Sequence, residues 1–168
     1  MNIERRALYA LTSSIASKMP EPVPAIRSAT AADGHRIEQL LSSLQLPTEE
    51  IEPHLPNFVV AEQGGQLVGV IGFERYGEEA LLRSAAVASR AQGLGIGKAL
   101  TEHVIGEAAA SGIDTLFLLT TTAERFFSHY GFETVTRAEV PDVVQRSIEF
   151  TSSCPASATV MRLSLRGH

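Results

Sequence analysis

The chain has 168 residues and a formal net charge of -5, a length that suits one domain with a substantial core. The acidic balance argues against general nucleic-acid binding, which usually shows as a basic excess. A single cysteine excludes an internal disulfide, and no cysteine and histidine spacing indicates a zinc site. The apolar runs are too short for a membrane helix, and residues 1–19 lack the apolar core of a secretory signal. A cytoplasmic protein without membrane contact is therefore expected.

Prolines mark a boundary near the N-terminus. Apolar residues recur at helical spacing over 8–15, and three prolines then break the pattern before residue 25. We interpret 1–24 as an N-terminal extension, either a simple appendage or a contact in a homodimer. Residues 25–168 are expected to form the domain.

The first half of that domain reads as strands with one helix. A short strand is expected at 25–30, and Asp33 then offers an N-cap for a helix through Leu44. Two strands, 58–62 and 66–75, are separated by Gly64 and Gly65, which is a hairpin signal. A further strand at 80–87 would extend the antiparallel meander.

The second half begins with a strand-helix-strand unit. A helix is expected at 95–110, and the nearly continuous apolar run 115–121 is typical of a buried parallel strand. The remaining expected elements are a helix at 123–130, a strand at 132–137, a helix at 141–150 and a closing strand at 158–165.

A glycine-rich loop connects the strand at 80–87 to the helix that follows. Glycines stand at 93, 95 and 97, where a helix start leaves backbone N–H groups unpaired and carries a positive dipole end. Glycines also let a ligand approach those groups closely. The loop is therefore a candidate phosphate site.

Two familiar phosphate loops do not fit these residues. A dinucleotide fingerprint would need glycine where Lys98 or Leu100 stands. A P-loop would need glycine at Gln92 and a hydroxyl residue at Ala99. A nucleotide-binding interaction module is therefore disfavoured.

The pattern that does fit is Gln92-x-x-Gly95-x-Gly97. It resembles the acetyl-CoA pyrophosphate loop of the GNAT (GCN5-related) N-acetyltransferases. A second phrase, from Ala123 through Phe126 and Phe127 to Gly131 and Phe132, resembles another signature of the same family.

The resemblance covers about 25–165 and implies a fold. This is the α/β GNAT acyl-CoA N-acyltransferase fold, a mixed, mostly antiparallel sheet that splays after the fourth strand and is flanked by helices. Acetyl-CoA, the acetyl donor, would lie in the gap. The residues implied to bind it are Ala85, Ala86, Val87, Gln92, Gly93, Leu94, Gly95, Ile96, Gly97, Lys98 and Phe127.

The sequence offers a candidate for the general base but no clear candidate for the general acid. Glu74 is a candidate general base, with a solvent-facing glutamate on an edge strand as the alternative. Phe127 stands where the family has a tyrosine acid, and phenylalanine cannot donate a proton. Tyr130 or Tyr76 could act instead, or the thiolate could leave with only solvent and backbone help.

Polar residues near the gap are candidates for binding the acceptor. A buried arginine such as Arg83 must be paired, with Glu74 or with a ligand anion, and the anion is the favoured reading. Thr120 and Thr121 could bind the acceptor or cap the next helix, and Arg137 could bind an anion or lie at the surface. The proposed set is Arg83, Ser84, Thr120, Thr121 and Arg137.

Several phrases, at 73–77, 81–84, 118–123 and 149–155, look like a narrower branch, the arsenic-resistance-associated N-acetyltransferases. The resemblance implies a small amino-acid-like amine that carries an arsenic or phosphorus oxyanion. The alternatives are acetylation of a protein N-terminus or of another metabolite, and a non-catalytic CoA-binding sensor.

Overall fold

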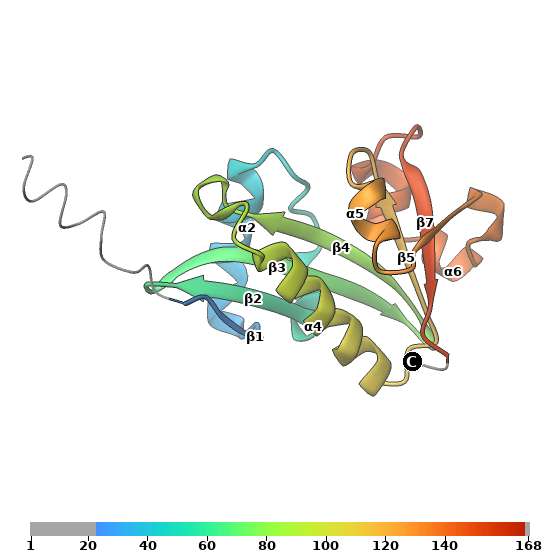
Figure 1. The fold of residues 1–168 in the computed structure, drawn as a ribbon. Coiled ribbons are helices and arrows are strands. Elements are labelled where there is room, and N and C mark those ends of the chain that lie inside the picture. The colour runs from blue at the N-terminus through green and yellow to red at the C-terminus, as the bar shows by residue number, and fades with distance from the viewer. Residues whose placement is uncertain (1–22, 167–168) are drawn as a thin grey trace, which may run out of the picture.

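The computed structural model describes residues 23–166, which form a seven-stranded sheet in the order β1-β2-β3-β4-β5-β7-β6 (Figure 1). Only β4 and β5 are parallel neighbours within it; the other neighbouring pairs are antiparallel. The strands are β1 (Ala25–Ser28), β2 (Phe58–Gln63), β3 (Gln66–Tyr76), β4 (Glu79–Val87), β5 (Thr115–Thr120), β6 (Glu133–Val135) and β7 (Thr159–Ser164). This is the mixed, mostly antiparallel sheet that the sequence predicts.

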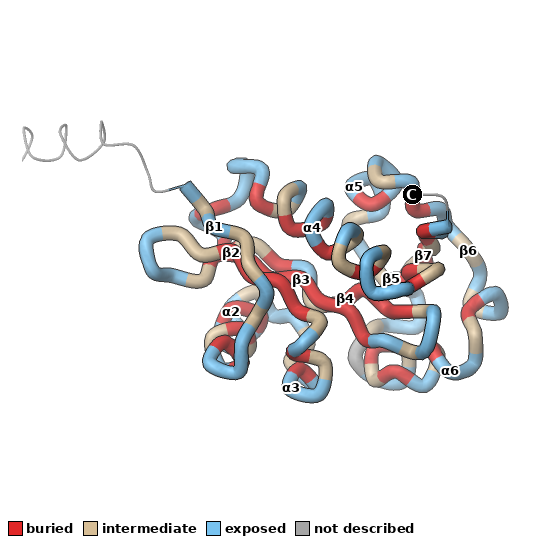
Figure 2. The backbone as a smooth tube through the Cα atoms, turned by 90° about the horizontal axis from the view of Figure 1, so that it is seen from below, coloured by how far each residue is buried: buried red, intermediate tan, exposed pale blue. Residues whose placement is uncertain are grey.

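Helices cover both faces of the sheet. The helices α2 and α3 lie on one face and α4 lies on the other (Figure 2). Their bounds are α2 (Gly34–Ser43), α3 (Ile51–His54), α4 (Ile96–Ala110), α5 (Glu124–Ser128) and α6 (Asp142–Gln145), with shorter turns η1 (Ala31–Asp33), η2 (Leu55–Asn57), η3 (Ser89–Ala91), η4 (Arg137–Glu139) and the π-helical η5 (Glu149–Ser153). The expected N-terminal extension lies almost entirely outside the described residues.

Local turn chemistry explains the β2–β3 hairpin. Gly64 and Gly65 have φ angles of 58° and 77°, and Gln63 pairs with Gln66 across them. Two consecutive left-handed residues give the turn that matches strand twist, and glycine adopts that conformation without a steric penalty. The predicted hairpin is confirmed.

The sheet splits inside β4. Pairing between β4 and β5 ends at Leu82 and Leu118, although β4 continues for five more residues. Just beyond the last pair, Ser84 has a φ of 59°, and the β3–β4 register shifts between Val70 and Gly72. The gap therefore opens within the fourth strand, earlier than the expected point after it. The bulge also interrupts the alternation of faces along this strand.

The C-terminal region differs most from expectation. The helix expected over 141–150 is only α6 followed by the π-helical η5, and the strand expected over 132–137 is the three-residue β6. Ser147 lies between the two helical pieces, and its buried hydroxyl donates to Glu74, which is 73 residues earlier. A long-range contact therefore replaces the continuous helix that the local pattern favours.

The main core lies between the sheet and its flanking helices. A close approach shows how tight it is: a Cβ added to Gly72 would lie 2.1 Å from a Phe58 ring carbon. A second, smaller cluster consists of Leu81, Phe117, Val140, Val144 and Val160. Across the described residues, no helix combines the length and apolar character needed to cross a bilayer.

Candidate active site

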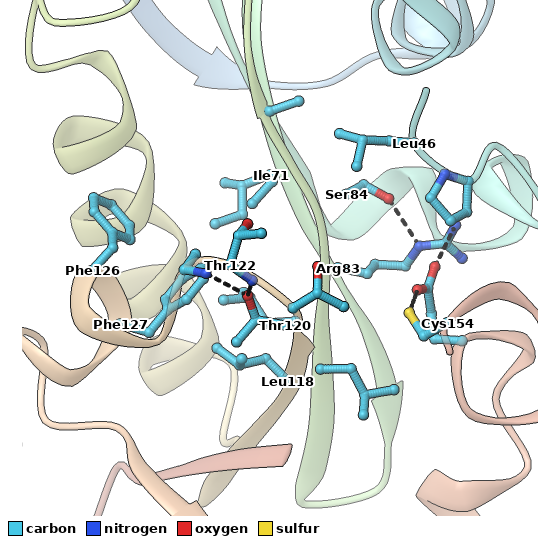
Figure 3. Close-up of a pocket in the computed structure, with 18 of the residues that line it drawn as sticks. Leu46, Ile71, Arg83, Ser84, Leu118, Thr120, Thr122, Phe126, Phe127 and Cys154 are labelled. Carbon is cyan, nitrogen blue, oxygen red and sulfur yellow. Dashed lines mark hydrogen bonds and ion pairs between the residues drawn. The ribbon is translucent and has the colours of Figure 1, made fainter. Parts of the chain in front are cut away.

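A cavity of about 770 Å³ opens where β4 and β5 separate (Figure 3). Both strands contribute to it, together with the loop after α2, the start of α4, α5 and the segment before β7. The lining residues include Gln45, Leu46, Pro47, Arg83, Ser84, Ala85, Ala86, Val87, Gln92, Gly97, Leu100, Thr101, Thr120, Thr121, Thr122, Phe126, Phe127, Glu149, Cys154 and Pro155.

The glycine loop reaches this cavity through Gln92 and Gly97, whereas Gly93, Leu94, Gly95, Ile96 and Lys98 are not part of its lining. Gly93 and Gly95 have φ angles of 81° and 82°, and α4 begins immediately after them. A Cβ at either glycine would meet no atom within 4 Å, so the loop faces open space. Gln92 ties the loop to β4 by donating from its amide to the Val87 carbonyl oxygen at 3.1 Å. Exposed N–H groups at a helix start fit a phosphate.

The free part of β4 forms the cavity wall next to the loop. Ala85, Ala86 and Val87 all line the cavity and lie beyond the last pair with β5. Ala86 and Val87 keep their β3 partners, Val70 and Gly69. In the described part of the chain, no strand pairs with the other edge of β4 here. Backbone groups on that edge can therefore bind an extended ligand.

Arg83 is the centre of a buried network. Its guanidinium is 2.7 Å from Glu74 Oε2 and 3.2 Å from Glu149 Oε1, and it donates to the Glu49 carbonyl oxygen at 2.6 Å. Its Nε donates to Ser84 Oγ at 3.0 Å. The side chain is 0% exposed. Of the two roles expected for Arg83, the structure therefore shows the ion pair with Glu74 and not a guanidinium free to bind an acceptor anion.

Glu74 is fully buried and accepts three hydrogen bonds. Besides Arg83, the hydroxyls of Tyr76 and Ser147 both donate to Glu74 Oε1 at 2.6 Å. Burial and the bond to Glu74 raise the pKa of Tyr76 to about 12, so this hydroxyl keeps its proton. Glu74 is not a solvent-facing glutamate, nor does it line the cavity. Its role as general base stays a prediction.

Two further candidates lie outside the cavity lining. Tyr130 packs against Phe126 with ring centroids 5.3 Å apart, and burial raises its pKa. Arg137 donates to the carbonyl oxygens of Pro155 and Ala156 at 3.3 Å and lies over the Phe150 ring. Neither residue lines the cavity, so the catalytic role of Tyr130 and the anion-binding role of Arg137 stay predictions.

The threonines do reach the cavity. Thr120 and Thr121 both line it, as Ser84 does. Thr120 Oγ1 also accepts the Ala123 N–H at 2.9 Å, at the start of α5 (Figure 3). Thr120 thus holds the start of α5, as expected for one threonine, and the acceptor-binding role stays a prediction.

Sequence reasoning missed two residues of the cavity wall. Glu149 lies on η5, and Cys154 donates from its thiol to Glu149 Oε2 at 3.1 Å (Figure 3). Burial, followed by the hydrogen bond to Glu149, raises the pKa of Cys154 to about 12. Cys154 is half-buried and lines the cavity. No periodic pattern marks either residue, and only the phrase at 149–155 pointed to this region.

Known proteins are similar to this chain in sequence and fold. Residues 54–134 match a family model described as an acetyltransferase (GNAT) domain. A solved N-acetylglutamate synthase from Neisseria gonorrhoeae, complexed with coenzyme A and N-acetyl-glutamate, superposes with a TM-score of 0.74 at 26% identity. That match covers 87% of this chain and 36% of the other.

Sequence relatives agree with the structural match. An amino-acid acetyltransferase from Neisseria meningitidis is 30% identical over 131 residues, which are 73% of this chain and 30% of that protein. An uncharacterized N-acetyltransferase from Chlorobaculum tepidum is 27% identical over 145 residues, a match that covers 82% of this chain and 91% of that protein. The chain thus spans less than a third of the amino-acid acetyltransferase and nearly the whole of the smaller relative.

Proposed function

Because this chain has the fold of the GNAT acetyltransferases, we propose that it transfers the acetyl group of acetyl-CoA to the amine of a small amino-acid-like molecule. The observation that carries the proposal is the cavity itself, which Gln92 and Gly97 of the glycine loop, the free edge of β4 and the residues Ser84, Thr120 and Thr121 all line. The names of the relatives, amino-acid acetyltransferase and N-acetylglutamate synthase, support this substrate class.

The donor would bind along two backbone surfaces. The N–H groups at Gly93–Gly97 would hold the pyrophosphate, with Gln92 and Lys98 at the sides of the loop. The free edge of Ala85, Ala86 and Val87 would bind the pantetheine arm. Leu94, Ile96 and Phe127 complete the proposed donor site. Acetyl-CoA supplies an activated thioester carbonyl for attack by the amine.

The thiolate would leave without a tyrosine acid. Phe127 lines the cavity where the family resemblance places that acid, and Tyr130 lies outside it. A thiol is a tolerable leaving group near neutral pH, since its pKa is far below that of an alcohol. Solvent or the amine's own proton can therefore complete the departure.

A narrower acceptor is an amino acid that carries an arsenic or phosphorus oxyanion. The phrases shared with the arsenic-resistance-associated branch support it, and the hydroxyls of Ser84, Thr120 and Thr121 are suitable donors to an oxyanion. Arg83 gives no direct support, because its donors are already used within the protein.

Thiol release from acetyl-CoA tests the proposal. The panel should contain glutamate and other ordinary amino acids, arsenic- and phosphorus-containing amino acids, polyamines and an N-terminal peptide. Each acceptor is paired with its N-acetylated form as a control, and products are identified by mass. Turnover on free amino acids alone is expected. Turnover confined to the peptide would contradict the substrate class, and acetyl-CoA binding without turnover on any amine would favour a sensor.

A further inference from the structure

Two carboxylates share Arg83, and only one of them faces the cavity. Glu74 takes the shorter contact, 2.7 Å, and is saturated by two hydroxyl donors as well. Glu149 has the longer contact, 3.2 Å, and its other oxygen accepts the thiol of Cys154, a weak donor. Glu149 lines the cavity and its side chain is 10% exposed, whereas Glu74 is 0% exposed and does not.

The charges of this cluster do not cancel. One guanidinium faces two carboxylates, so the cluster carries one excess negative charge when both acids are ionised. Burying uncompensated charge is costly. A cation that enters the cavity beside Glu149 would complete the balance, and the protonated amine of the acceptor is such a cation.

We propose that Glu149 is the catalytic carboxylate, which binds the acceptor's ammonium group and takes one of its protons. This inference rests on the proposed acetyltransferase function. The transferred proton leaves the ammonium nitrogen for a Glu149 oxygen and passes to solvent through the cavity mouth. The freed lone pair then forms the C–N bond while the thioester C–S bond breaks. The second proton of the nitrogen leaves with the sulfur as the free thiol.

The groups around Glu149 suit this task. Arg83 on β4 fixes one carboxylate oxygen, and the Glu149 N–H donates to Ser147 Oγ at 3.1 Å, which holds the turn in place. The raised pKa of Cys154 keeps its thiol protonated, so it donates to the carboxylate and adds no charge. The charge of Arg137, which lies outside the cavity lining, works in the opposite direction and lowers the pKa of Cys154. Glu74 is linked to Glu149 through Arg83 and through the Ser147 hydroxyl.

The decisive experiment compares Glu149→Gln with the wild-type chain across pH. At neutral pH the kcat/KM for the amine should fall by at least about 100-fold, the range of general-base contributions. This deficit should shrink as the pH rises, because more acceptor then arrives already deprotonated. Acetyl-CoA affinity should stay within about twofold. A purely structural role would not give a deficit that depends on pH.

Three further variants sharpen the comparison. Glu133→Gln removes an exposed glutamate charge on β6 and should leave kcat/KM unchanged. Glu149→Asp keeps the charge opposite Arg83 but withdraws it by one methylene, so it should fold and lose rate. Glu74→Gln tests the competing base. Any deficit in kcat/KM that it causes should stay the same as the pH rises.

The outcomes separate the two proposals. If Glu149→Gln keeps the turnover of the wild-type chain, the role of Glu149 is overturned and the proposed function is not. The same holds if the pH-dependent deficit is found in Glu74→Gln instead. Loss of folding in both Glu149 variants would assign this residue a structural role and also overturn the inference. A wild-type chain that acetylates no amine would overturn the proposed function, and the inference with it.

Discussion

At the scale of single residues, Arg83 compensates two buried acids at once. Its guanidinium contacts Glu74 and Glu149, and its remaining donors bind a carbonyl oxygen and a hydroxyl. Breaking a buried ion pair leaves a charge without compensation, which destabilises a protein by about 3–5 kcal/mol. The cavity wall therefore depends on this one side chain.

Replacing Arg83 with Met should lower the free energy of unfolding by about 3–5 kcal/mol, since two carboxylates would lose their partner. Denaturant unfolding measures this loss. Arg125→Met is a matched control, because Arg125 is exposed on α5 and should change stability by less than about 0.5 kcal/mol. Equal stability of the two variants would show that the buried pair contributes little.

Cys154 should react slowly despite being only half-buried. Its pKa of about 12, against an ordinary value of 9.0, lowers the thiolate fraction at pH 8 by about 1,000-fold. Alkylation by iodoacetamide, measured by mass spectrometry, should therefore be far slower in the native chain than in the chain unfolded by urea. Glu149→Gln should accelerate it, because that carboxylate also raises the thiol pKa. Rapid native alkylation would argue against this environment.

At the scale of elements, the split of β4 from β5 and the start of α4 together form the proposed donor site. The glycine loop lies where the end of β4 meets α4, with Gly95 at the position before the first helical residue. The first N–H groups of α4 have no partner within the helix, and Gly97 in its first turn lines the same gap that the strands leave open. Neither element would form the site without the other.

Gly95→Glu should weaken acetyl-CoA binding by at least about tenfold. The left-handed φ of 82° strains any side chain there, and the new carboxylate would repel the pyrophosphate. Isothermal calorimetry measures the affinity. Gly106→Glu adds the same charge on an exposed part of α4 where nothing lies within 4 Å, so it should bind normally. Equal affinities would remove the loop from the donor site.

At the scale of the whole molecule, a cluster of ion pairs connects β1 to neighbouring elements, and none of its residues lines the cavity. Asp33 is 1% exposed and pairs with Arg27 at 2.7 Å and with Arg36 at 3.2 Å. Glu62 on β2 contacts the same two arginines. The hydrogen bond from Arg27 is the main reason that the pKa of Asp33 lies far below its usual range.

This cluster should make the fold sensitive to acid. In the unfolded chain Asp33 gains a proton near pH 4, whereas in the folded chain it stays ionised to much lower pH. Its contribution is therefore present in full above about pH 4 and is lost as the pH falls below that value. Urea midpoints measured from pH 6 to pH 2 should fall less steeply for Asp33→Asn. Parallel curves would show that other carboxylates control acid unfolding.

Much of the architecture could be predicted from the sequence because it depends on local patterns. The glycine pair at 64 and 65, the apolar run that became β5 and the helix after the glycine loop each depend on neighbours in the chain. The two family motifs likewise predicted the fold, which the comparisons confirm. Turn chemistry and hydrophobic period act over a few residues, so a sequence can reveal them.

The chemistry of the acceptor side was decided only by tertiary structure. Glu74, Arg83 and Ser147 meet from three separate segments, and their contact turned the expected helix at 141–150 into two short pieces. The same packing placed Glu149 and Cys154 on the cavity wall and left Tyr130 and Arg137 off it. Residue types and spacing determined the sheet, its turns and the glycine loop. Partners and exposure of charged side chains depend on which distant segments pack together, and no local pattern encodes that.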